Sequence, residues 1–339
     1  MSHDQSHFQY TAEQFNSKML YDPGIQILIQ EEDRTVFRMA NETGEGIITR
    51  YPVFPGIELL YNDIHMSDAM SSNKLPRQDI MEINHCREGR FECAFPDGRT
   101  AYLRAGDLAV NMLSNRTSGN WFPLSHYHGI SVVLDLSEAV RTLAEISASF
   151  GDMPLDPYRI RDHLCRQNTC CIMRATDSIQ HIFAELYTAP EVLRNHYFKL
   201  KILELLLFLS MTESPRQGNR RYFAPTQVES IRAIHDYLVS HLDRQVTLAE
   251  LSKRFEIPLT SMKLCFKSVY GDSIHAYMQT YRMQKATSLL IRTDGRITDI
   301  AARLGYKNAS KFSEVFKQTF GTSPSNYRKT FCPNGVSFD

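Results

Sequence analysis

The sequence lacks an apolar run long enough to cross a membrane. Its most apolar stretch, ILELLLFLSM from Ile202 to Met211, is about half of the ~20 residues that a membrane span needs, and Glu204 interrupts it. The first residues, MSHDQSHFQY, lack the basic, apolar and small-residue order of a signal peptide. We therefore expect neither export nor a membrane anchor, which predicts a cytoplasmic protein.

Paired cysteines are also missing. The cysteines are odd in number and none belongs to a Cys-x-x-Cys pair, so the sequence predicts neither a disulfide framework nor a zinc site. We expect a reducing compartment. The seven cysteines are Cys86, Cys93, Cys165, Cys170, Cys171, Cys265 and Cys332.

The chain has no net charge, because 38 Lys and Arg balance 38 Asp and Glu. The two signs are unevenly distributed. From Thr226 to Thr330 there are 16 Lys and Arg against 9 Asp and Glu, a balance of +7, and the remainder has −7. A basic region predicts an anionic partner such as nucleic acid, although a solvated helical surface would show the same excess.

A chain of 339 residues exceeds the usual size of one domain. The segment TESPRQGNRRYFAP is polar, contains Pro and Gly and has no hydrophobic period, which predicts a linker. We therefore expect an N-terminal domain at residues 1–211, a linker at 212–225 and a C-terminal domain at 226–331.

Helix signals are dense in the C-terminal domain. Thr226 with Glu229, and Thr247 with Glu250, have the spacing of capping boxes, in which a hydroxyl and a carboxylate each bind an unpaired backbone N–H. An apolar stripe at helical spacing follows the first of them. The pattern predicts an all-α domain.

Two similar units lie within this domain. A first helix is expected from Leu248 to about Phe255, and a second helix, capped by the hydroxyl of Thr260 or Ser261, is expected to end at Gly271. The second unit repeats this arrangement, with a short helix capped by Thr298, a break at Gly305 and a helix from Asn308 to Gly321. Each unit is a helix-turn-helix, and an internal repeat of this kind on a basic segment favours DNA binding.

The residues between the two units predict one long helix. Ser273 to Thr293 contains neither Gly nor Pro. At ~1.5 Å rise per residue this helix spans roughly 30 Å, which is close to the ~34 Å between successive major-groove faces of DNA. One chain could therefore reach two adjacent grooves.

The run ITDIAARLGYKNASKFSEVFKQTFGTSPSNYR, from Ile297 to Arg328, resembles the signature of the AraC/XylS family of transcription regulators. RMQKATSLL and the first unit fit the same pattern, so the resemblance covers about Thr226 to Thr330. We expect Phe312, Phe316 and Phe320 to anchor the last recognition helix. Gly321 should then stop that helix in a left-handed conformation, Ser323 should cap the next one, Pro324 should begin it and Tyr327 should pack it.

The resemblance implies that the exposed face of each second helix meets double-stranded DNA. Lysines late in a helix suit phosphates, whereas the helix starts should read bases, with Lys263 on a base edge and Thr260 and Leu264 on thymine methyls. Leu264 departs from the family, where a long polar residue is often found. The predicted contacts are Thr260, Ser261, Lys263, Leu264, Lys267, Ser310, Lys311, Ser313, Glu314, Lys317 and Arg328.

The N-terminal domain is rich in short β-type runs between Gly46 and Leu136, among them DIMEINHC and RFECAF as two separate runs, which predict a small sandwich or barrel. The order EGRFECAF followed by GDLAV resembles the cupin-like sensor barrel of this family. A barrel of this size can hold one small effector. Its candidate binding residues are Glu82, Trp121, His126 and His128.

Three helices are expected after the barrel, at residues 136–150, 176–187 and 196–211. Leu200, Leu203, Leu207 and Met211 recur at helical spacing in the last of them. The resemblance implies a homodimer that forms through such helices, with RNA polymerase as a further partner of an activator. The alternative is that this apolar stripe packs in the core of its own chain.

The predicted fold class is therefore α+β, with a cupin-like small β-barrel and helices followed by an all-α domain of two helix-turn-helix units. The predicted function is an effector-responsive, DNA-binding transcription regulator with no cofactor, no bound metal and no enzymatic activity. Two alternatives stay open. The barrel could be a metal-dependent cupin enzyme that uses His126 and His128, or the chain could be a constitutive DNA-binding dimer without an effector.

Overall fold

A computed structural model describes residues 25–68, 79–95, 100–115, 117, 119–166, 169–212 and 223–331. The chain divides into two compact units, Met1–Tyr222 and Phe223–Asp339. The division falls within the predicted linker, most of which lies outside the described residues. Helix α5 ends at Met211 and helix α6 begins at Pro225, at the two edges of that linker.

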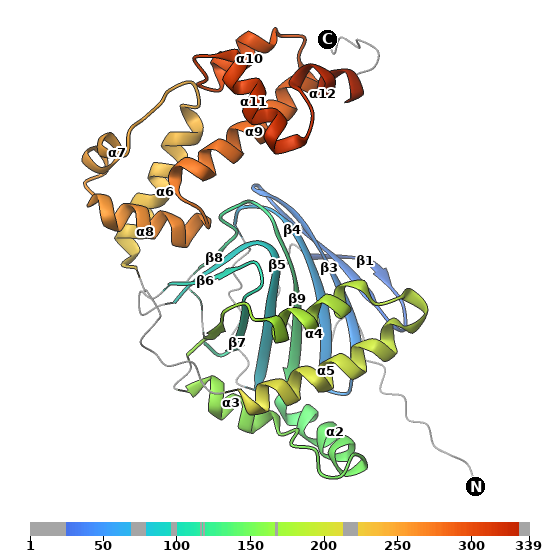
Figure 1. Cartoon of the computed structure of the whole chain (residues 1–339). Coiled ribbons are helices and arrows are strands. Elements are labelled where there is room, and N and C mark those ends of the chain that lie inside the picture. Colours follow the sequence, from blue (N-terminus) through green and yellow to red (C-terminus); the bar gives the residue numbers. More distant parts are fainter. Residues whose placement is uncertain are drawn as a thin grey trace. The chain divides into compact units, whose positions relative to one another are not determined.

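The N-terminal unit is built on an antiparallel sheet with the order β1-β2-β3-β4-β9-β5-β7-β10, and β6 and β8 also pair with β5 (Figure 1). Among the described residues, the first and last strands of this order do not pair with each other. The strands are β1 (Ile25–Gln30), β2 (Thr35–Asn41), β3 (Gly44–Phe54), β4 (Ile57–His65), β5 (Ile80–Ala94), β6 (Thr100–Arg104), β7 (Leu108–Met112), β8 (Gly119–Trp121), β9 (Tyr127–Asp135) and β10 (Cys171–Met173).

The predicted β-type runs correspond to β3–β7 and β9, with one difference. The runs DIMEINHC and RFECAF form a single strand, β5, because the chain bends between them without leaving the sheet. A register shift lies between Cys86 and Glu88, and Gly89 follows with φ of +84°. A Cβ at Gly89 would lie 2.2 Å from the carbonyl oxygen of His126, so the bend requires glycine.

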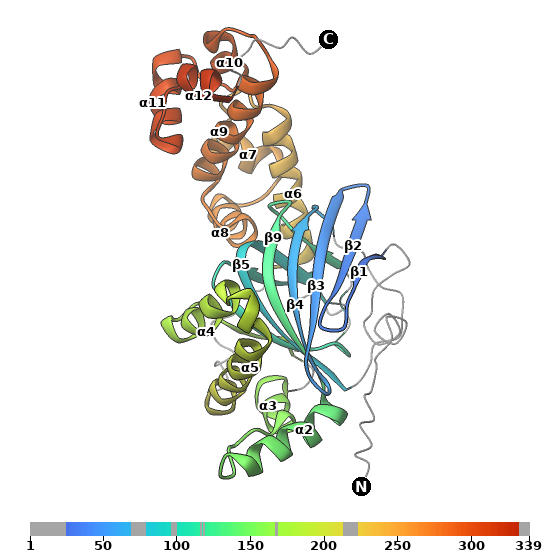
Figure 2. The ribbon, with the colours of Figure 1, turned by 90° about the vertical axis from the view of Figure 1, so that its right-hand side faces the viewer.

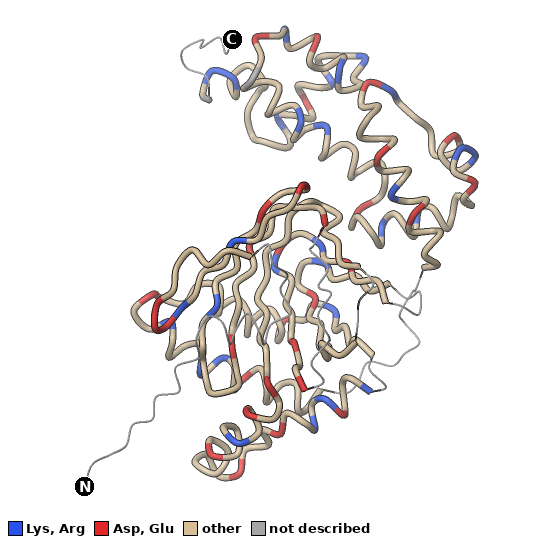
Figure 3. Tube along the Cα trace, turned by 180° about the vertical axis from the view of Figure 1, so that it is seen from behind, with Lys and Arg blue, Asp and Glu red and all other residues tan. Residues whose placement is uncertain are grey.

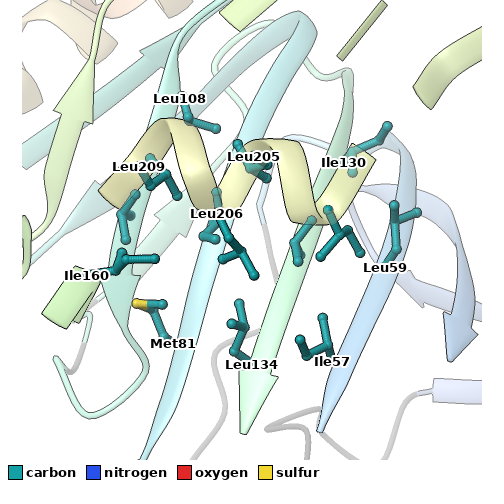
Figure 4. Close-up of a cluster of buried hydrophobic side chains, with 14 of the residues drawn as sticks. Ile57, Leu59, Met81, Leu108, Ile130, Leu134, Ile160, Leu205, Leu206 and Leu209 are labelled. Atoms are coloured by element: carbon teal, nitrogen blue, oxygen red, sulfur yellow. The ribbon is translucent and has the colours of Figure 1, made fainter. Parts of the chain in front are cut away.

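Two long helices cover one face of the sheet (Figure 2). They are α4 (Asp177–Thr188) and α5 (Arg194–Met211), and both were predicted, as was α2 (Leu136–Ser149). Figure 4 shows side chains of α5 packed onto residues from β4, β5, β7 and β9. The short helices α3 (Pro157–Leu164) and η2 (Glu191–Leu193) complete this layer. Among the described helices, none combines the length and apolar character that crossing a membrane requires.

The opposite face of the sheet carries a second apolar cluster, which includes Phe37, Ile64, Phe122 and Tyr127. Strand residues alternate between the two clusters: Met81 and Ile83 of β5 belong to the helix-covered core. This alternation is expected where both faces of a strand are buried.

The C-terminal unit contains helices alone among its described residues. They are α6 (Pro225–Ser240), α7 (Leu248–Arg254), α8 (Leu259–Tyr270), α9 (Ile274–Arg292), α10 (Ile297–Arg303), α11 (Ala309–Phe320) and α12 (Pro324–Phe331). The predicted all-α domain is confirmed, and the α+β class with it.

One predicted capping box is confirmed and one is wrong. Glu250 Oε2 accepts from the backbone N–H of Thr247 at 2.6 Å, and Thr247 Oγ1 accepts from the N–H of Glu250 at 3.2 Å. These contacts with Thr247 lower the pKa of Glu250. By contrast, α6 begins at Pro225 after Ala224, because proline favours the first helical position, so Thr226 is already inside the helix.

His85 of β5 is a buried histidine that makes the stability of the N-terminal unit depend on pH. Its ring stacks on Phe183 of α4 with centroids 4.1 Å apart. Burial lowers its pKa from 6.5 to about 4. Between these values the unfolded chain binds a proton that the folded chain excludes. The free energy of unfolding should therefore decrease as pH falls through this range, by at most about 3 kcal/mol.

His85→Gln should flatten this part of the pH profile, as measured by chemical denaturation between about pH 7 and pH 4. The exposed His181 on α4 provides the matched control, His181→Gln. An unchanged profile in His85→Gln would contradict the assignment.

Candidate nucleic-acid interface

The first helix-turn-helix unit consists of α7 and α8. Its turn contains Glu256 with φ of +52° and the buried Ile257. Ser252 Oγ of α7 donates to the carbonyl of Ile257 at 2.7 Å, which fastens the turn to the first helix. Helix α8 begins at Leu259 after Pro258, without a side-chain cap, so the predicted cap at Thr260 or Ser261 is wrong.

The second unit consists of α10 and α11. Gly305 has φ of +78° in the turn, and Asn308 Oδ1 accepts from the N–H groups of Ser310 and Lys311 at 2.7 and 3.3 Å. The predicted start near Asn308 and the left-handed stop at Gly321, with φ of +71°, are both confirmed. The predicted cap at Thr298 is wrong, because α10 begins at Ile297 after Arg296.

The long helix α9 joins the two units, as predicted, and Ser273 caps it by accepting from the N–H of Ala276 at 3.3 Å. Met283, Ala286 and Leu290 of α9 share one apolar core with α10 and α11. Helix α9 also packs against α8 and α12. Both units are thereby attached to one helical spacer.

Each second helix has a buried and an exposed face. Met262 and Phe266 of α8, and Phe312 and Phe316 of α11, are completely buried. The opposite faces contain most of the predicted DNA contacts. Those exposed to solvent are Thr260, Lys263, Leu264, Lys267, Ser310, Lys311, Glu314 and Lys317, while Ser261 and Ser313 are half-buried.

Internal contacts occupy part of the α11 face. Lys311 Nζ lies 3.0 Å from Glu314 Oε2, and Glu314 Oε1 accepts from Gln318 at 3.4 Å. Ser313 Oγ donates to the carbonyl of Ala309 at 2.9 Å. A ligand that contacts these groups must compete with the existing partners. Figure 3 shows that Lys and Arg are spread over several helices of the C-terminal unit.

Arg328, which was predicted to contact a phosphate, makes hydrogen bonds within the C-terminal unit. Its Nε donates to the carbonyl of Leu290 at 3.1 Å and its Nη2 to that of Gly295 at 2.7 Å, so it joins α12 to the end of α9. Asn326 N–H donates to Ser323 Oγ at 3.2 Å, as expected of a cap. Tyr327 packs on Phe316, with ring centroids 5.4 Å apart.

The predicted contacts left out Lys307, one of several exposed basic residues of the C-terminal unit. Lys307 directly precedes Asn308 at the start of α11. A basic residue beside a helix-capping asparagine was the available signal, but the prediction considered only positions within the helix.

The candidate effector residues do not form one site. Glu82 of β5 is half-buried and hydrogen-bonded with Ser131; burial raises the pKa of Glu82 and this bond opposes the rise. Ser131 Oγ also accepts from Asn62 Nδ2 at 3.1 Å. Trp121 pairs with Glu92 across β8 and β5. His128 pairs with Glu88, six residues along β5 from Glu82, which is roughly 20 Å of strand.

The two histidines differ in their surroundings. His126 precedes β9, and its Nδ1 contacts the carbonyl of Leu124 at 3.1 Å. His128 lies on β9 with its ring 6.3 Å from that of His126. Its near neighbours are Asp63 and His65 of β4, which the sequence pattern did not single out.

The turn of the second unit allows a stability test. A Cβ at Gly305 would lie 2.4 Å from the carbonyl oxygen of Leu242, and alanine would also adopt an unfavourable positive φ. Gly321 has a similar φ, but a Cβ there would meet no heavy atom within 4 Å. Gly321→Ala should therefore lower the free energy of unfolding by only about 1–2 kcal/mol, which is the penalty for alanine in a left-handed conformation. Gly305→Ala should lower it by more. Equal losses in denaturant unfolding would refute the steric argument.

Comparison with known proteins finds matches for these two units. The family model described as a helix-turn-helix domain matches residues 251–330. The chain is similar to the HTH-type transcriptional activator RhaR of Mannheimia succiniciproducens, with 26% identity over 136 residues, which are 40% of this chain and 48% of RhaR. It is similar to the HTH-type transcriptional regulator ExsA of Pseudomonas aeruginosa, with 33% identity over 132 residues, which are 38% of this chain and 46% of ExsA.

Among solved structures, the C-terminal domain of AraT, a response regulator from Geobacillus stearothermophilus, matches with a TM-score of 0.30 and 29% identity. That match covers 32% of this chain and 88% of the AraT domain. The chain spans about half the length of RhaR and ExsA. The segment that the family model matches, residues 251–330, lies within the α7–α12 region that contains the two units. The chain thus contains a helix-turn-helix domain that is similar to those of transcription regulators such as RhaR and ExsA.

Proposed function

We propose that the chain is a sequence-specific DNA-binding transcription regulator that reads two adjacent major grooves with α8 and α11. The observation that carries this proposal is the pair of helix-turn-helix units on one spacer helix. Helix α9 has 19 residues, or about 28 Å at the usual helical rise. This length is comparable to the ~34 Å between major-groove faces. The relatives' description as transcription regulators supports the same function.

The two recognition helices should contribute differently. Lys263, Leu264 and Lys267 of α8 are exposed, and no described hydrogen bond or ion pair engages the two lysines. On α11, the Lys311–Glu314 pair must rearrange before either side chain contacts a base. We therefore assign direct base reading mainly to α8, with Lys263 as a base-edge donor and Leu264 against a thymine methyl. Lys267 and Lys317, near the helix ends, are assigned to phosphates.

Lys317→Ala should weaken binding to all DNA sequences alike and lower the slope of log affinity against log salt by about one unit, because one phosphate contact is lost. Binding by the full chain to a selected sequence and to random DNA, at several salt concentrations, measures both effects. Lys199→Ala, which changes an exposed lysine in the N-terminal unit, is the matched control. A loss confined to one base pair would contradict the phosphate assignment.

Lys263→Ala should instead weaken the free energy of DNA binding by about 1–3 kcal/mol when the preferred base pair is present. The loss should be small when another base pair stands at that position. Selection of bound sequences from randomised DNA should show a relaxed preference at that single position. A uniform loss of affinity across positions would instead indicate that Lys263 contacts a phosphate.

We also propose that α5 forms a homodimer contact. Its inner face, including Phe198, Leu205 and Leu209, is buried in the core. Its outer face combines polar and apolar side chains: Lys199 is exposed, and Leu200 is 64% and Met211 82% exposed. An amphipathic surface helix normally presents polar residues to water, so these two exposed apolar side chains favour a further partner.

Leu200→Glu combined with Met211→Glu should shift the full chain from dimer to monomer in sedimentation velocity, because the added carboxylates would be buried in the contact. Ser178→Glu on the exposed side of α4 is the control. A monomeric unsubstituted chain would exclude the proposed contact.

We further propose that the face of the sheet opposite α4 and α5 binds a small-molecule effector. The supporting observation is the chain of hydrogen bonds among Asn62, Ser131 and Glu82. Polar groups beside an apolar cluster need hydrogen-bond partners. An effector acts only through unequal affinity for two arrangements of the regulator. RNA polymerase is the expected further partner if the chain is an activator.

Thermal-shift screening of the full chain against small polar compounds tests effector binding, because a ligand of the folded state raises the melting temperature. The shift should disappear in Glu82→Gln. Absence of any stabilising compound, together with intact DNA binding, would favour the constitutive dimer.

A further inference from the structure

A cluster of metal-ligating side chains lies where β4 meets β9. Asp63 and His65 are two residues apart on β4, and Asp63 pairs directly with His128 of β9. The Nε2 atoms of both histidines lie 2.9 Å from Asp63 Oδ1. Within the described part of the chain, this is the group of three such residues whose ligand atoms all lie within 4.8 Å of one another.

The cluster lies on the helix-covered side of the sheet, beyond the core. Ile130, Val132 and Leu134 alternate along β9 with side chains in that core, so His128 continues the same row. Asp63 and His65 side chains are 58% and 59% exposed. The cluster is therefore open to an ion from solvent and is separate from Glu82 and Ser131 on the other face.

The contact between His128 and Asp63 is not an ordinary hydrogen bond. His128 Nε2 is shielded from solvent and has no hydrogen-bond partner, although Asp63 Oδ1 is 2.9 Å away. A shielded nitrogen without a partner costs free energy. An ion placed between these two atoms and His65 Nε2 would supply the missing interaction.

Glu88 of β5 provides support behind His128. It pairs with His128 across the strands, and its Oε2 lies 3.8 Å from the other ring nitrogen, Nδ1. A carboxylate near Nδ1 favours the tautomer that carries its proton there and leaves the Nε2 lone pair free. Metal-binding histidines commonly have such a partner.

We propose that Asp63, His65 and His128 bind a divalent transition-metal ion of the zinc class. Two imidazoles and one carboxylate suit Zn²⁺ and disfavour Mg²⁺ and Ca²⁺, which prefer oxygen ligands. At Zn–N and Zn–O lengths near 2.1 Å, tetrahedral ligand atoms lie about 3.4 Å apart. The observed 2.9 Å separations require only a small outward movement of exposed side chains. A water would complete the coordination.

This donor set differs from the pair that the sequence suggested. His126 does not belong to the cluster, and its Nδ1 already contacts a carbonyl. The ion would connect β4 to β9, two central strands of the sheet, and so stabilise the unit that contains them. The inference is independent of DNA binding by the C-terminal unit.

The test uses the full chain without a histidine tag, stripped with a chelator and titrated with Zn²⁺ by calorimetry. One ion per chain should bind and raise the melting temperature. His65→Ala, His128→Ala and Asp63→Asn should each weaken binding at least about 10-fold, and Glu88→Gln should weaken it by about 10–100-fold, as supporting carboxylates do. His126→Ala and the exposed His196→Ala should bind like the unsubstituted chain.

Titration with Co²⁺ identifies the ligands by visible absorption, and thermal melts without metal show whether each variant is folded. Visible bands of a low-coordinate nitrogen and oxygen site should appear and be lost in His65→Ala/His128→Ala. Three results would overturn the proposal: no binding to the folded chain, undiminished binding in that double variant, or an intense near-ultraviolet thiolate band that assigns the metal to cysteine.

Discussion

Burial of aromatic side chains on the second helix of each unit is the constraint on which the proposed DNA-binding surface depends. Phe266 fixes the inward face of α8, and Phe312 and Phe316 fix that of α11. Because α-helical side chains repeat every 3.6 residues, anchoring one face determines which residues point outward. Helix α9 packs against both second helices, α8 and α11, so their outward faces are carried on one framework, as the proposed reading of two major grooves requires.

In the N-terminal sheet, the alternation of side chains along each strand places the candidate sites on different faces. Alternate residues of β5 and β9 face opposite sides, which places Glu82 and Ser131 on one face and His128 on the other. A ligand that binds Glu82 and an ion that binds His128 would therefore occupy different sites on shared strands. Both would act on β5 and β9, through Glu82 and Glu88 on one strand and Ser131 and His128 on the other.

Local signals predicted the helical domain well where a side chain bonds its own helix end. Asn308, Ser323 and Gly321 have the predicted roles, since each acts on backbone within four residues. The predictions failed where a helix begins beside a proline or without a side-chain cap. Pro225 moved the beginning of α6 ahead of Thr226, and α8 begins directly after Pro258. A hydroxyl at the correct spacing thus predicts a cap only when the backbone start is also correct.

The sequence by itself determined the two helix-turn-helix units, their outward faces and the position of the long helix, because periodicity and capping act over a few residues. Only the tertiary structure decided that Arg328 binds the carbonyls of Leu290 and Gly295. It also decided that Asp63 lies opposite His128, and that Glu88 lies behind it. These partners are far apart along the chain, and strand register and helix packing bring them together. A shift of one residue in register would send His128 to the other face of the sheet.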